Sequence, residues 1–512
     1  MPSFNFVNIL GNNLVRHHGD SIIASSYINT DSRTIGHGDT FAAVIGSKFN
    51  GHDFINQAIN QGATAIIHSQ PLKDYQNGVS YFLVKDPQMA TQQLQQHFYP
   101  QMPTSKIAVT GTNGKSSVVN FIKQFAHNIN VNAATIGTIG LELSNNSKEP
   151  QQLAPKAFLT PQLTTPSALT IAYLMQRLAA NNINILAMEA SSHGLEQHRL
   201  EGLNFNVAAF TNLSPEHLDY HFNMTNYANA KSILFSDHLA ANATVVINTD
   251  NEYSEVMIKA STANKNLSKL ITFGNNVYQT IKTTNINHQH WLIKQVTASS
   301  QGSNLVLIVN GIEYKASIPL YGSFQVQNII VAIAALVASG FELDLVWPLI
   351  NKLTNIFGRM DNVSNNYQQP QIFIDFAHDA AALDNASGEL RRHFPSTPLT
   401  IVFGCGGDRD RLKRPKMGKI ACQNATNVIV TDDNPRFEEP SQIRQEILKG
   451  CGDNAIEIAD RSKAIAHAIS NSPANGIVLI AGKGHEQYQL IGNIYHDYSD
   501  YKVVEQLLMV KS

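Results

Sequence analysis

Ile107-Ala108-Val109-Thr110-Gly111-Thr112-Asn113-Gly114-Lys115-Ser116-Ser117 is the stretch that decides the fold. A short apolar run leads into a glycine-rich turn, and a helical pattern begins directly after it. This order is typical of a phosphate-binding loop, because glycines let backbone N–H groups approach phosphate oxygens and the helix N-terminus adds positive charge. Lys115 is placed to reach the outer phosphates, and the Ser116 hydroxyl to bind Mg²⁺. The P-loop pattern GxxxxGK[ST] requires glycine where this chain has Val109, so an ordinary glycine-rich turn is the alternative.

Short apolar runs alternate with helix-length segments on both sides of this turn. Strands that alternate with helices indicate βαβ units, so we expect an α/β protein with mostly parallel sheets and ligands at the carboxyl ends of the strands. Two segments have helix length, Ser117 to Asn128 and Pro166 to Asn181. The candidate strands are Ala63–Ile67, Lys106–Thr110, Ile183–Met188, Val207–Thr211, Thr244–Asn248, Leu399–Phe403, Val428–Thr431 and Ile477–Ala481.

The 512 residues are enough for three or four domains at roughly 150 residues each. Asp86 to Thr104 is rich in Gln and contains three prolines, so its end is interpreted as a linker. A second boundary is expected after Thr354 and before a strand at Gln371–Asp375. The sequence therefore predicts three domains, 1–103, 104–356 and 357–512. Residues 251–314 are polar and are interpreted as a peripheral meander.

Composition and charge exclude several classes of protein. Hydrophobic residues make up 43% and charged residues 15%, which is typical of a folded globular chain. A net charge of -2 gives no reason to expect nucleic acid or an anionic membrane as a partner. Three cysteines cannot form a disulfide framework, and no signal peptide or membrane span is evident. We therefore expect a cytoplasmic protein that is not attached to a membrane.

Further motifs follow the glycine-rich turn in a fixed order, and together they resemble the Mur ligases over nearly the whole chain. The resemblance implies an amino-terminal UDP-substrate-binding domain, a central P-loop-type ATPase domain and a carboxy-terminal Rossmann-like domain that receives an amino acid. The motifs are Asp31-Ser32-Arg33, Met188 to Leu195 (MEASSHGL), Phe210 to His221 (FTNLSPEHLDYH), Ala230-Lys231, Gly404 to Asp410 (GCGGDRD), Asp433 to Arg436 (DNPR) and Gly482 to Glu486 (GKGHE).

The resemblance also implies an activity. It is that of an ATP-dependent amide ligase which adds meso-diaminopimelate to UDP-N-acetylmuramoyl-L-alanyl-D-glutamate through an acyl phosphate, in peptidoglycan precursor synthesis. Members with Arg in the place of Arg436 add diaminopimelate, since its second carboxylate calls for a cation. The alternatives are the same ligation with L-lysine, or a catalytically silent relative that binds UDP-sugars. ATP as co-substrate, Mg²⁺ as cofactor, small-molecule substrates and a monomeric state are expected.

The expected catalytic residues are Lys115, Glu189, His217 and Lys231. Glu189 ends an apolar strand, where an unpaired carboxylate would be costly unless it met a cation or donors, and with Ser116 it suits Mg²⁺. A helix-capping carboxylate is the alternative. The resemblance implies that His217 helps to hold a second metal ion. It also implies that Lys231 is carbamylated, with an unmodified lysine that touches phosphate as the alternative.

The remaining expected site residues come from the matched motifs. In place of the Tyr-Ala-His-Thr/Asn-Pro usual in the family this chain has Phe376-Ala377-His378-Asp379-Ala380, and Asp379 is interpreted as a helix N-cap. Cys405 is expected to be a buried thiol without catalytic function. For ATP the residues are Gly111, Thr112, Asn113, Gly114, Lys115, Ser116, Ser117, Asn328, Arg359, Asp375 and His378. For the UDP-substrate they are Thr30, Ser32, Ser47, Lys48, Phe49, Thr164, Thr165, Ser191, Gln197 and Arg199. For the amino acid they are Arg409, Asp433, Asn434, Pro435, Arg436, Gly482 and Glu486.

Overall fold

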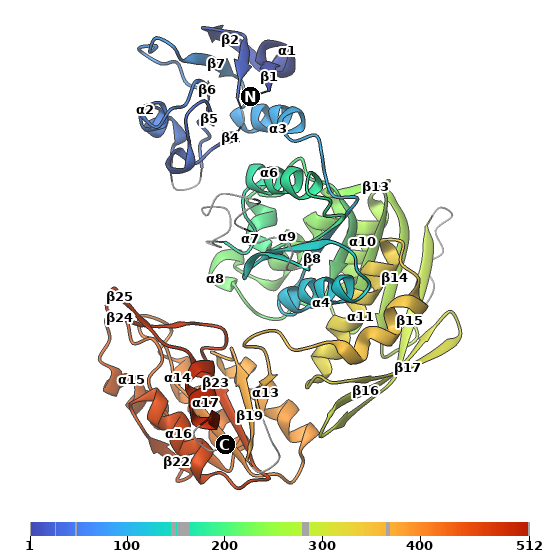
Figure 1. Ribbon diagram of the computed structural model, residues 1–512, viewed down its shortest axis with the longest axis vertical. Coiled ribbons are helices and arrows are strands. Elements are labelled where there is room, and N and C mark those ends of the chain that lie inside the picture. Colours follow the sequence, from blue (N-terminus) through green and yellow to red (C-terminus); the bar gives the residue numbers. More distant parts are fainter. Residues whose placement is uncertain are drawn as a thin grey trace. The chain divides into compact units, whose positions relative to one another are not determined.

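The computed structural model describes residues 2–509 except 26, 47–48, 145–149, 151–152, 154–162, 279–285 and 365–368 (Figure 1). Its contacts divide the chain into two compact units. The first comprises residues 1–292 and 328–347, and the second comprises 293–327 and 348–512. Each unit is built on parallel sheets with helices in the connections, so the predicted α/β fold class is confirmed. The domain boundaries at 103 and 356 stay predictions.

The amino-terminal part of the first unit contains a five-stranded sheet in the order β2-β7-β6-β5-β4, parallel except for the β2–β7 pair. Its strands are β2 Leu14–His18, β4 Ile28–Asn29, β5 Thr40–Ala42, β6 Ala65–His68 and β7 Ser80–Val84. A small pair, β1 Ser3–Asn5 and β3 Ile22–Ala24, lies beside helix α1 Phe6–Leu10, and α2 is Ile55–Asn60.

Most of the Gln-rich stretch before residue 104 is helix α3, Pro87–Phe98, so a linker is left only at its end. The Asp86 carboxylate caps this helix by accepting the N–H groups of Gln88 and Met89. Pro87 stands at the first helical position, where a missing N–H costs nothing.

The main sheet of the first unit carries the glycine-rich turn. Its strand order is β10-β9-β11-β8-β12-β13-β14-β15, and β15 runs on into the second unit. The strands are β8 Ser105–Thr110, β9 Ala133–Gly137, β10 Gly140–Leu143, β11 Ile185–Glu189, β12 Phe205–Phe210, β13 Leu239–Asn248, β14 Leu267–Gly274 and β15 Asn287–Ser299. The helices are α4 Lys115–Asn128, α6 Ala168–Ala179, α7 Ser192–Glu196, α8 Leu218–His221, α9 Met224–Asp237, α10 Ser254–Ala263, α11 Ser323–Ala338 and α12 Leu343–Val346.

The expectation of a peripheral meander over residues 251–314 is wrong for most of that segment. It contains helix α10 and strands β14 and β15, which continue the main sheet with parallel pairing. Buried residues such as Leu270, Ile271 and Trp291 lie on these strands. Asn, Thr and Lys residues lie between these apolar positions, and Thr272 on β14 is itself buried, so the sequence pattern does not mark the strands as part of a core.

The second unit contains a six-stranded sheet in the order β18-β19-β23-β20-β21-β22, parallel except for β18. Phe373 and Leu479 face one core with α13, α14 and α15, whereas Ile372 and Ile480 face the other with α16 and α17. Both faces are therefore covered, as in a doubly wound fold. The strands are β18 Asp361–Asn362, β19 Gln371–Asp375, β20 Leu399–Phe403, β21 Asn427–Val430, β22 Ala455–Glu457 and β23 Ile477–Ala481. The helices are α13 Ala380–His393, α14 Lys413–Asn424, α15 Pro440–Leu448, α16 Arg461–Asn471 and α17 Asp500–Met509.

Two antiparallel hairpins complete the second unit. They are β16 Gly302–Val309 with β17 Ile312–Ile318, and β24 Tyr488–Ile491 with β25 Ile494–Asp497. Among the described residues, none of the helices combines the length and the apolar character that a bilayer span requires.

Candidate active site

The glycine-rich turn joins β8 to α4, and its two outer glycines leave no space for a side chain. Gly114 has φ +86°, and a Cβ there would lie 2.2 Å from the Asn328 Oδ1 atom. A Cβ on Gly111 would lie 1.9 Å from the Thr211 Oγ1 atom. Glycine is therefore required at both places, and the N-cap of α4, Gly114, offers no side chain that would cover the start of the helix.

Lys115 folds back over this turn. Its Nζ atom donates to the carbonyl oxygens of Gly111, at 2.8 Å, and Thr112, at 2.7 Å. The ammonium is therefore held above the turn by backbone acceptors. This position suits a cation that will meet the phosphates of a nucleotide.

Glu189 lies at the end of β11 and is 2% exposed. Its Oε1 atom accepts hydrogen bonds from the Ser116 hydroxyl and the Thr138 N–H, both at 2.9 Å. A Cβ on Gly137 would lie 2.1 Å from the same oxygen. No lysine or arginine forms an ion pair with Glu189 among the residues that the structure describes. A buried carboxylate with neutral donors alone has capacity left for a cation.

The alternative of a helix-capping role for Glu189 is wrong. The cap of α7 is Ser191, whose Oγ atom accepts the Gly194 N–H at 3.1 Å. Glu189 instead points to Ser116 at the start of α4. Ser116 and Glu189 thus form a pair of oxygen donors beside the turn.

Lys231, on α9, is 1% exposed and reaches the same turn. Its Nζ atom donates to the Gly111 carbonyl at 2.9 Å and lies 4.5 Å from the centre of the Tyr227 ring. Burial and the nearby Lys115 ammonium hold the pKa of Lys231 well below its usual value. In the described part of the chain no carboxylate forms an ion pair with it.

His217 stands before α8 in a left-handed conformation, with φ +55° and a side chain 45% exposed. Its ring centre lies 4.8 Å from that of His193. His221 stacks on Tyr227 at 4.9 Å, and its Nε2 atom lies 3.0 Å from the Ser192 hydroxyl. Burial, together with the nearby His193 and Lys231, lowers the pKa of His221 to about 4.

His193, His221 and Tyr227 were not predicted as site residues. The two histidines stand inside the matched motifs, so their position in the sequence was the signal that pointed to them. Tyr227 carries no such signal, because its role follows from the ring contact with Lys231. Within the described residues, no group of three or more His, Cys, Asp or Glu is arranged to hold a metal ion.

The residues expected around the sugar and peptide lie next to Glu189. The Thr165 hydroxyl is 2.9 Å from both the Glu189 carbonyl oxygen and the Ser191 hydroxyl. Arg199 donates from Nη1 to the Thr165 carbonyl at 3.1 Å and from Nη2 to the Gln197 side chain. Thr164 lies 3.3 Å from the Thr138 hydroxyl. The structure thus gathers these side chains at one edge of the main sheet.

The residues expected near the uracil and diphosphate are more scattered. Ser32 is buried, and its hydroxyl donates to the Gln57 side chain at 3.1 Å. Thr30 is exposed, and Phe49 is 72% exposed. Ser47 and Lys48 lie outside the described residues. The assignments of this group stay predictions.

Arg359, Asp375 and His378 lie in the second unit, around the ring of Phe376. The Arg359 guanidinium is 4.9 Å from the centre of that ring, and the His378 ring is 4.7 Å from it. Asp375 accepts the N–H groups of Met360 and Ala377 at 2.7 and 2.8 Å. These two hydrogen bonds fix the orientation of its carboxylate within the unit.

Asp379 caps α13, as predicted, by accepting the Ala382 N–H at 2.8 Å. Cys405 is also confirmed as a buried thiol. It is 3% exposed, and burial raises its pKa to about 12, which excludes a thiolate nucleophile at neutral pH.

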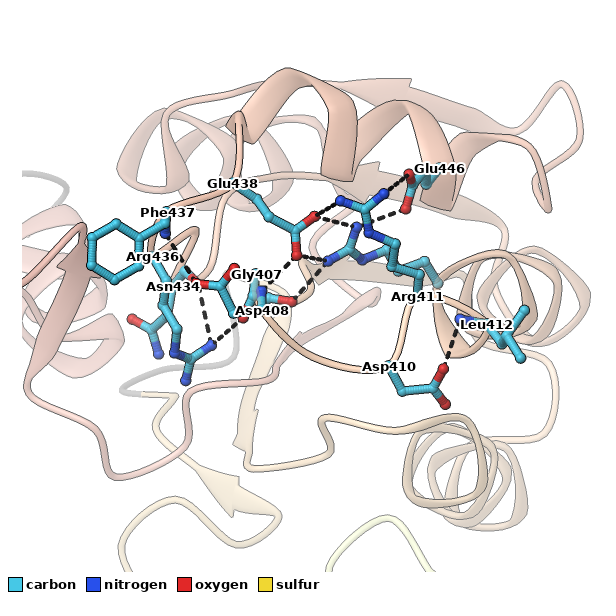
Figure 2. Close-up of polar contacts among 12 residues, drawn as sticks. Gly407, Asp408, Asp410, Arg411, Leu412, Asn434, Arg436, Phe437, Glu438 and Glu446 are labelled. Atoms are coloured by element: carbon cyan, nitrogen blue, oxygen red, sulfur yellow. Dashed lines mark hydrogen bonds and ion pairs between the residues drawn. The ribbon is translucent and has the colours of Figure 1, made fainter.

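The residues expected to bind the amino acid follow three adjacent parallel strands, β20, β21 and β23. Asn434 accepts the Gly407 N–H on its carbonyl at 2.9 Å and donates from Nδ2 to Glu486 Oε2 at 2.8 Å. Arg436 donates to the Gly407 carbonyl at 2.8 Å (Figure 2). The loops thus meet at one rim of the sheet, as the carboxyl ends of adjacent strands do. Arg409 is exposed, and Asp433 and Pro435 are buried on this rim, where the Asp433 carboxylate approaches Gly482.

Glu438 and Arg414 form ion pairs and hydrogen bonds with the loops of this rim. Glu438 accepts the Asp408 N–H at 2.5 Å and is also held by Arg411 (Figure 2). Arg414, with a side chain that is 0% exposed, donates to Glu438 and to Glu446 at 2.6 Å. These hydrogen bonds lower the pKa of Glu438 to about 2. Neither residue was predicted, because both contacts join positions far apart in the sequence.

The fold and the site define a P-loop α/β protein whose second unit carries a Rossmann-like sheet. Three family models match the chain: "Mur ligase family, catalytic domain" over residues 25–99, "Mur ligase middle domain" over 109–336 and "Mur ligase, glutamate ligase domain" over 358–484. The chain belongs to the Mur ligase family, as the motifs predicted.

Named relatives are similar over nearly their full length. The UDP-N-acetylmuramoyl-L-alanyl-D-glutamate–2,6-diaminopimelate ligase of Rickettsia prowazekii is 39% identical over 94% of this chain and 95% of its own. The ligase of the same name from Zymomonas mobilis is 37% identical over 90% and 89%. A solved structure with this name is 31% identical, with a TM-score of 0.71 over 100% of this chain and 99% of that chain. MurF ligase from Thermotoga maritima in complex with ADP, 16% identical with a TM-score of 0.61 over 95% and 98%, shares the fold.

Proposed function

We propose that this chain is an ATP-dependent ligase that joins meso-diaminopimelate to UDP-N-acetylmuramoyl-L-alanyl-D-glutamate in peptidoglycan precursor synthesis. The observation that carries the proposal is the full-length similarity to ligases with this name, in a chain that keeps Lys115, Glu189 and Lys231 around one turn. Two lysines and a buried carboxylate around the turn are not expected in a relative that has lost catalytic activity.

The reaction has two steps. The acceptor carboxylate attacks the γ-phosphorus of ATP, ADP leaves, and an acyl phosphate forms. The amine of the amino acid then attacks the acyl carbon, phosphate leaves, and the nitrogen loses its proton as the amide forms. Phosphoryl transfer depends mostly on position and on neutralised charge. Lys115 and the turn from Gly111 to Ser117 supply both, and Asn328 lies beside Gly114.

Ser116, Glu189, His217 and Lys231 as a carbamate are the residues that would hold Mg²⁺. The Ser116 and Glu189 oxygens fit a hard cation, because they lie 2.9 Å apart and Glu189 has no cationic partner in the described residues. Bound Mg²⁺ would neutralise phosphate charge. A neutral Lys231 amine can add CO₂ and release a proton to give the carbamate, and its lowered pKa supports this. An unmodified Lys231 that touches phosphate is the alternative.

The other substrate contacts are assigned by motif. Arg359, Asp375 and His378 serve ATP. Thr30, Ser32, Ser47, Lys48, Phe49, Thr164, Thr165, Ser191, Gln197 and Arg199 serve the UDP-substrate. The rim formed by Arg409, Asp433, Asn434, Pro435, Arg436, Gly482 and Glu486 receives the amino acid. The enzyme is proposed to act as a cytoplasmic monomer.

Phosphate release from ATP tests the proposal, with the UDP-dipeptide present and one amino acid supplied at a time. We expect release with meso-diaminopimelate and little with L-lysine. A preference for lysine would support the alternative substrate. No release with any amino acid would support a silent relative and would overturn the proposal.

A further inference from the structure

Lys483 is a buried cation that the proposed chemistry does not use. It lies two residues after the end of β23, and its side chain is 0% exposed. Its Nζ atom donates to Asn434 Oδ1 and to the Tyr488 carbonyl, both at 2.9 Å. The rings of Tyr488 and Tyr498 lie 5.9 and 5.8 Å away. An ammonium enclosed in this way cannot bind substrate from solvent, so its effect must pass through its neighbours.

The contact with Lys483 fixes the orientation of the Asn434 side-chain amide. Without it, the amide could adopt either of two orientations in which its oxygen and nitrogen exchange places. Asn434 Oδ1 accepts from the Lys483 ammonium and from the Leu490 N–H, both at 2.9 Å. Both partners are donors, so the oxygen must face them. The Nδ2 group is then forced toward Glu486, where it donates to Oε2 at 2.8 Å.

Glu486 is therefore held from one side. Asn434 Nδ2 donates to its Oε2 atom, and the Lys483 ammonium lies 3.5 Å from that same oxygen. In the described part of the chain, no hydrogen bond reaches the Oε1 atom. The side chain is 19% exposed, so this second oxygen is open to an ammonium at the rim.

We propose that Lys483 is a positioning residue for the amino-acid substrate: it orients Asn434, which in turn holds Glu486 ready for the substrate ammonium. The proposal rests on the proposed function, because it takes Glu486 as the residue that meets the amino acid. A purely structural role, in which Lys483 only ties the β24–β25 hairpin through the Tyr488 carbonyl, is the competing explanation.

A double-mutant cycle separates the two roles. Lys483→Met keeps most of the length of the side chain and removes its donors, and Glu486→Gln removes the charge of the final partner. Lys483→Met should raise KM for meso-diaminopimelate about 10- to 100-fold, since a hydrogen-bonded charge is lost. The KM values for ATP and the UDP-substrate should stay within about twofold. In the Glu486→Gln background, Lys483→Met should change KM for diaminopimelate less than about twofold, because both changes act on one contact.

Lys502→Met is the matched control, since Lys502 is an exposed lysine of the same unit, paired with Asp497. It should leave all three KM values unchanged. Additive effects of Lys483→Met and Glu486→Gln, or an equal loss for all three substrates, would overturn the proposal.

If Lys483→Met does not fold, a second variant tests whether Asn434 holds Glu486 for the substrate. Asn434→Asp keeps an acceptor for Lys483 and removes the N–H donor to Glu486, so KM for diaminopimelate should rise while the thermal midpoint stays near the wild-type value. An unchanged KM would contradict the proposal. Failure of the proposed function looks different, because wild-type enzyme would then not use diaminopimelate at all.

Discussion

Lys115 and Lys231 donate to the same acceptor, the carbonyl oxygen of Gly111. Lys115 is half-buried at the turn, whereas Lys231 is enclosed under the Tyr227 ring. Two ammonium groups on one oxygen repel each other, and the more deeply buried one loses its proton more readily. Under the proposed function, Lys115 supplies positive charge to the phosphates and Lys231 is the amine that reacts with CO₂.

Arg436 is expected to decide which amino acid is added. Its guanidinium is held on the Gly407 carbonyl, and its pairing with the distal carboxylate of diaminopimelate would be charge-assisted. Arg436→Ala should lower kcat/KM for diaminopimelate roughly 30-fold or more, and for lysine much less. Steady-state kinetics with each amino acid measure this, and KM for ATP is the internal control. An equal loss for both amino acids would contradict the assignment.

His221 should make the protein less stable in mild acid. Its pKa is lowered to about 4 in the folded state, so below pH 6.5 the unfolded chain takes up a proton that the folded chain refuses. Stability is therefore lost as the pH falls from about 6.5 to 4, by about 1 kcal/mol at pH 5.5.

His221→Gln should lose about 1 kcal/mol less than wild type between pH 7.5 and 5.5, because it removes this proton uptake. Urea unfolding at the two pH values measures the difference. His97→Gln, at an exposed position on α3, is the control. If His221→Gln loses as much stability as the wild type between the two pH values, groups other than His221 cause the loss.

At the scale of elements, the strands that sequence predicts best are buried on both faces. Leu399–Phe403, Ile477–Ala481 and Gln371–Asp375 were predicted with the observed bounds, because continuous apolar runs end abruptly at polar residues or glycine. The P-loop turn was found for a similar reason, since its glycines and Lys115 follow such a run.

The elements that were missed depend on partners distant in the sequence. In β14 and β15 polar residues alternate irregularly with apolar ones. The apolar residues are recognisable as core positions only once the neighbouring strands of the sheet are known. The burial of Arg414 is equally hard to predict from sequence, because its partners Glu438 and Glu446 lie 24 and 32 residues away. A charged residue in a helix is usually solvated, so nothing local marks this one as buried.

Arg411, just before α14, and Arg414, on α14, can be compared directly, because they contact the same two carboxylates. Both contact Glu438 and Glu446, but the Arg414 side chain is 0% exposed and that of Arg411 is 55% exposed. Arg414→Met should destabilise the protein by about 3–5 kcal/mol, since it removes the buried cation that pairs with both carboxylates.

Arg411→Met removes an exposed ion pair and should cost less than about 1 kcal/mol. Calorimetric unfolding of the two variants measures both effects. Equal losses would mean that burial does not set the strength of these pairs.

At the scale of the whole molecule, the phosphates of ATP are assigned to the turn at residues 111–117, whereas the uracil and diphosphate of the UDP-substrate are assigned to residues 30–49. Lys115→Ala should abolish ligation and the stabilisation by ATP, because the charge above the turn is lost. It should keep the stabilisation by UDP-substrate, about 2.7 kcal/mol at a concentration 100 times Kd. Thermal unfolding with each ligand measures this. Lys123→Ala, on the same helix and paired with Glu142, should respond to both ligands. Loss of the response to UDP-substrate in Lys115→Ala would contradict the division.

The chain crosses between its two units at residues 292/293, 327/328 and 347/348. On the ribosome, the β16–β17 hairpin of the second unit is therefore made before residues 328–347, which belong to the first. Translation of the remaining residues, 328–512, takes on the order of ten to thirty seconds at roughly 5–20 residues per second, and the hairpin lacks the rest of its own unit during that time. Neither unit can therefore be expressed as one continuous piece of the gene.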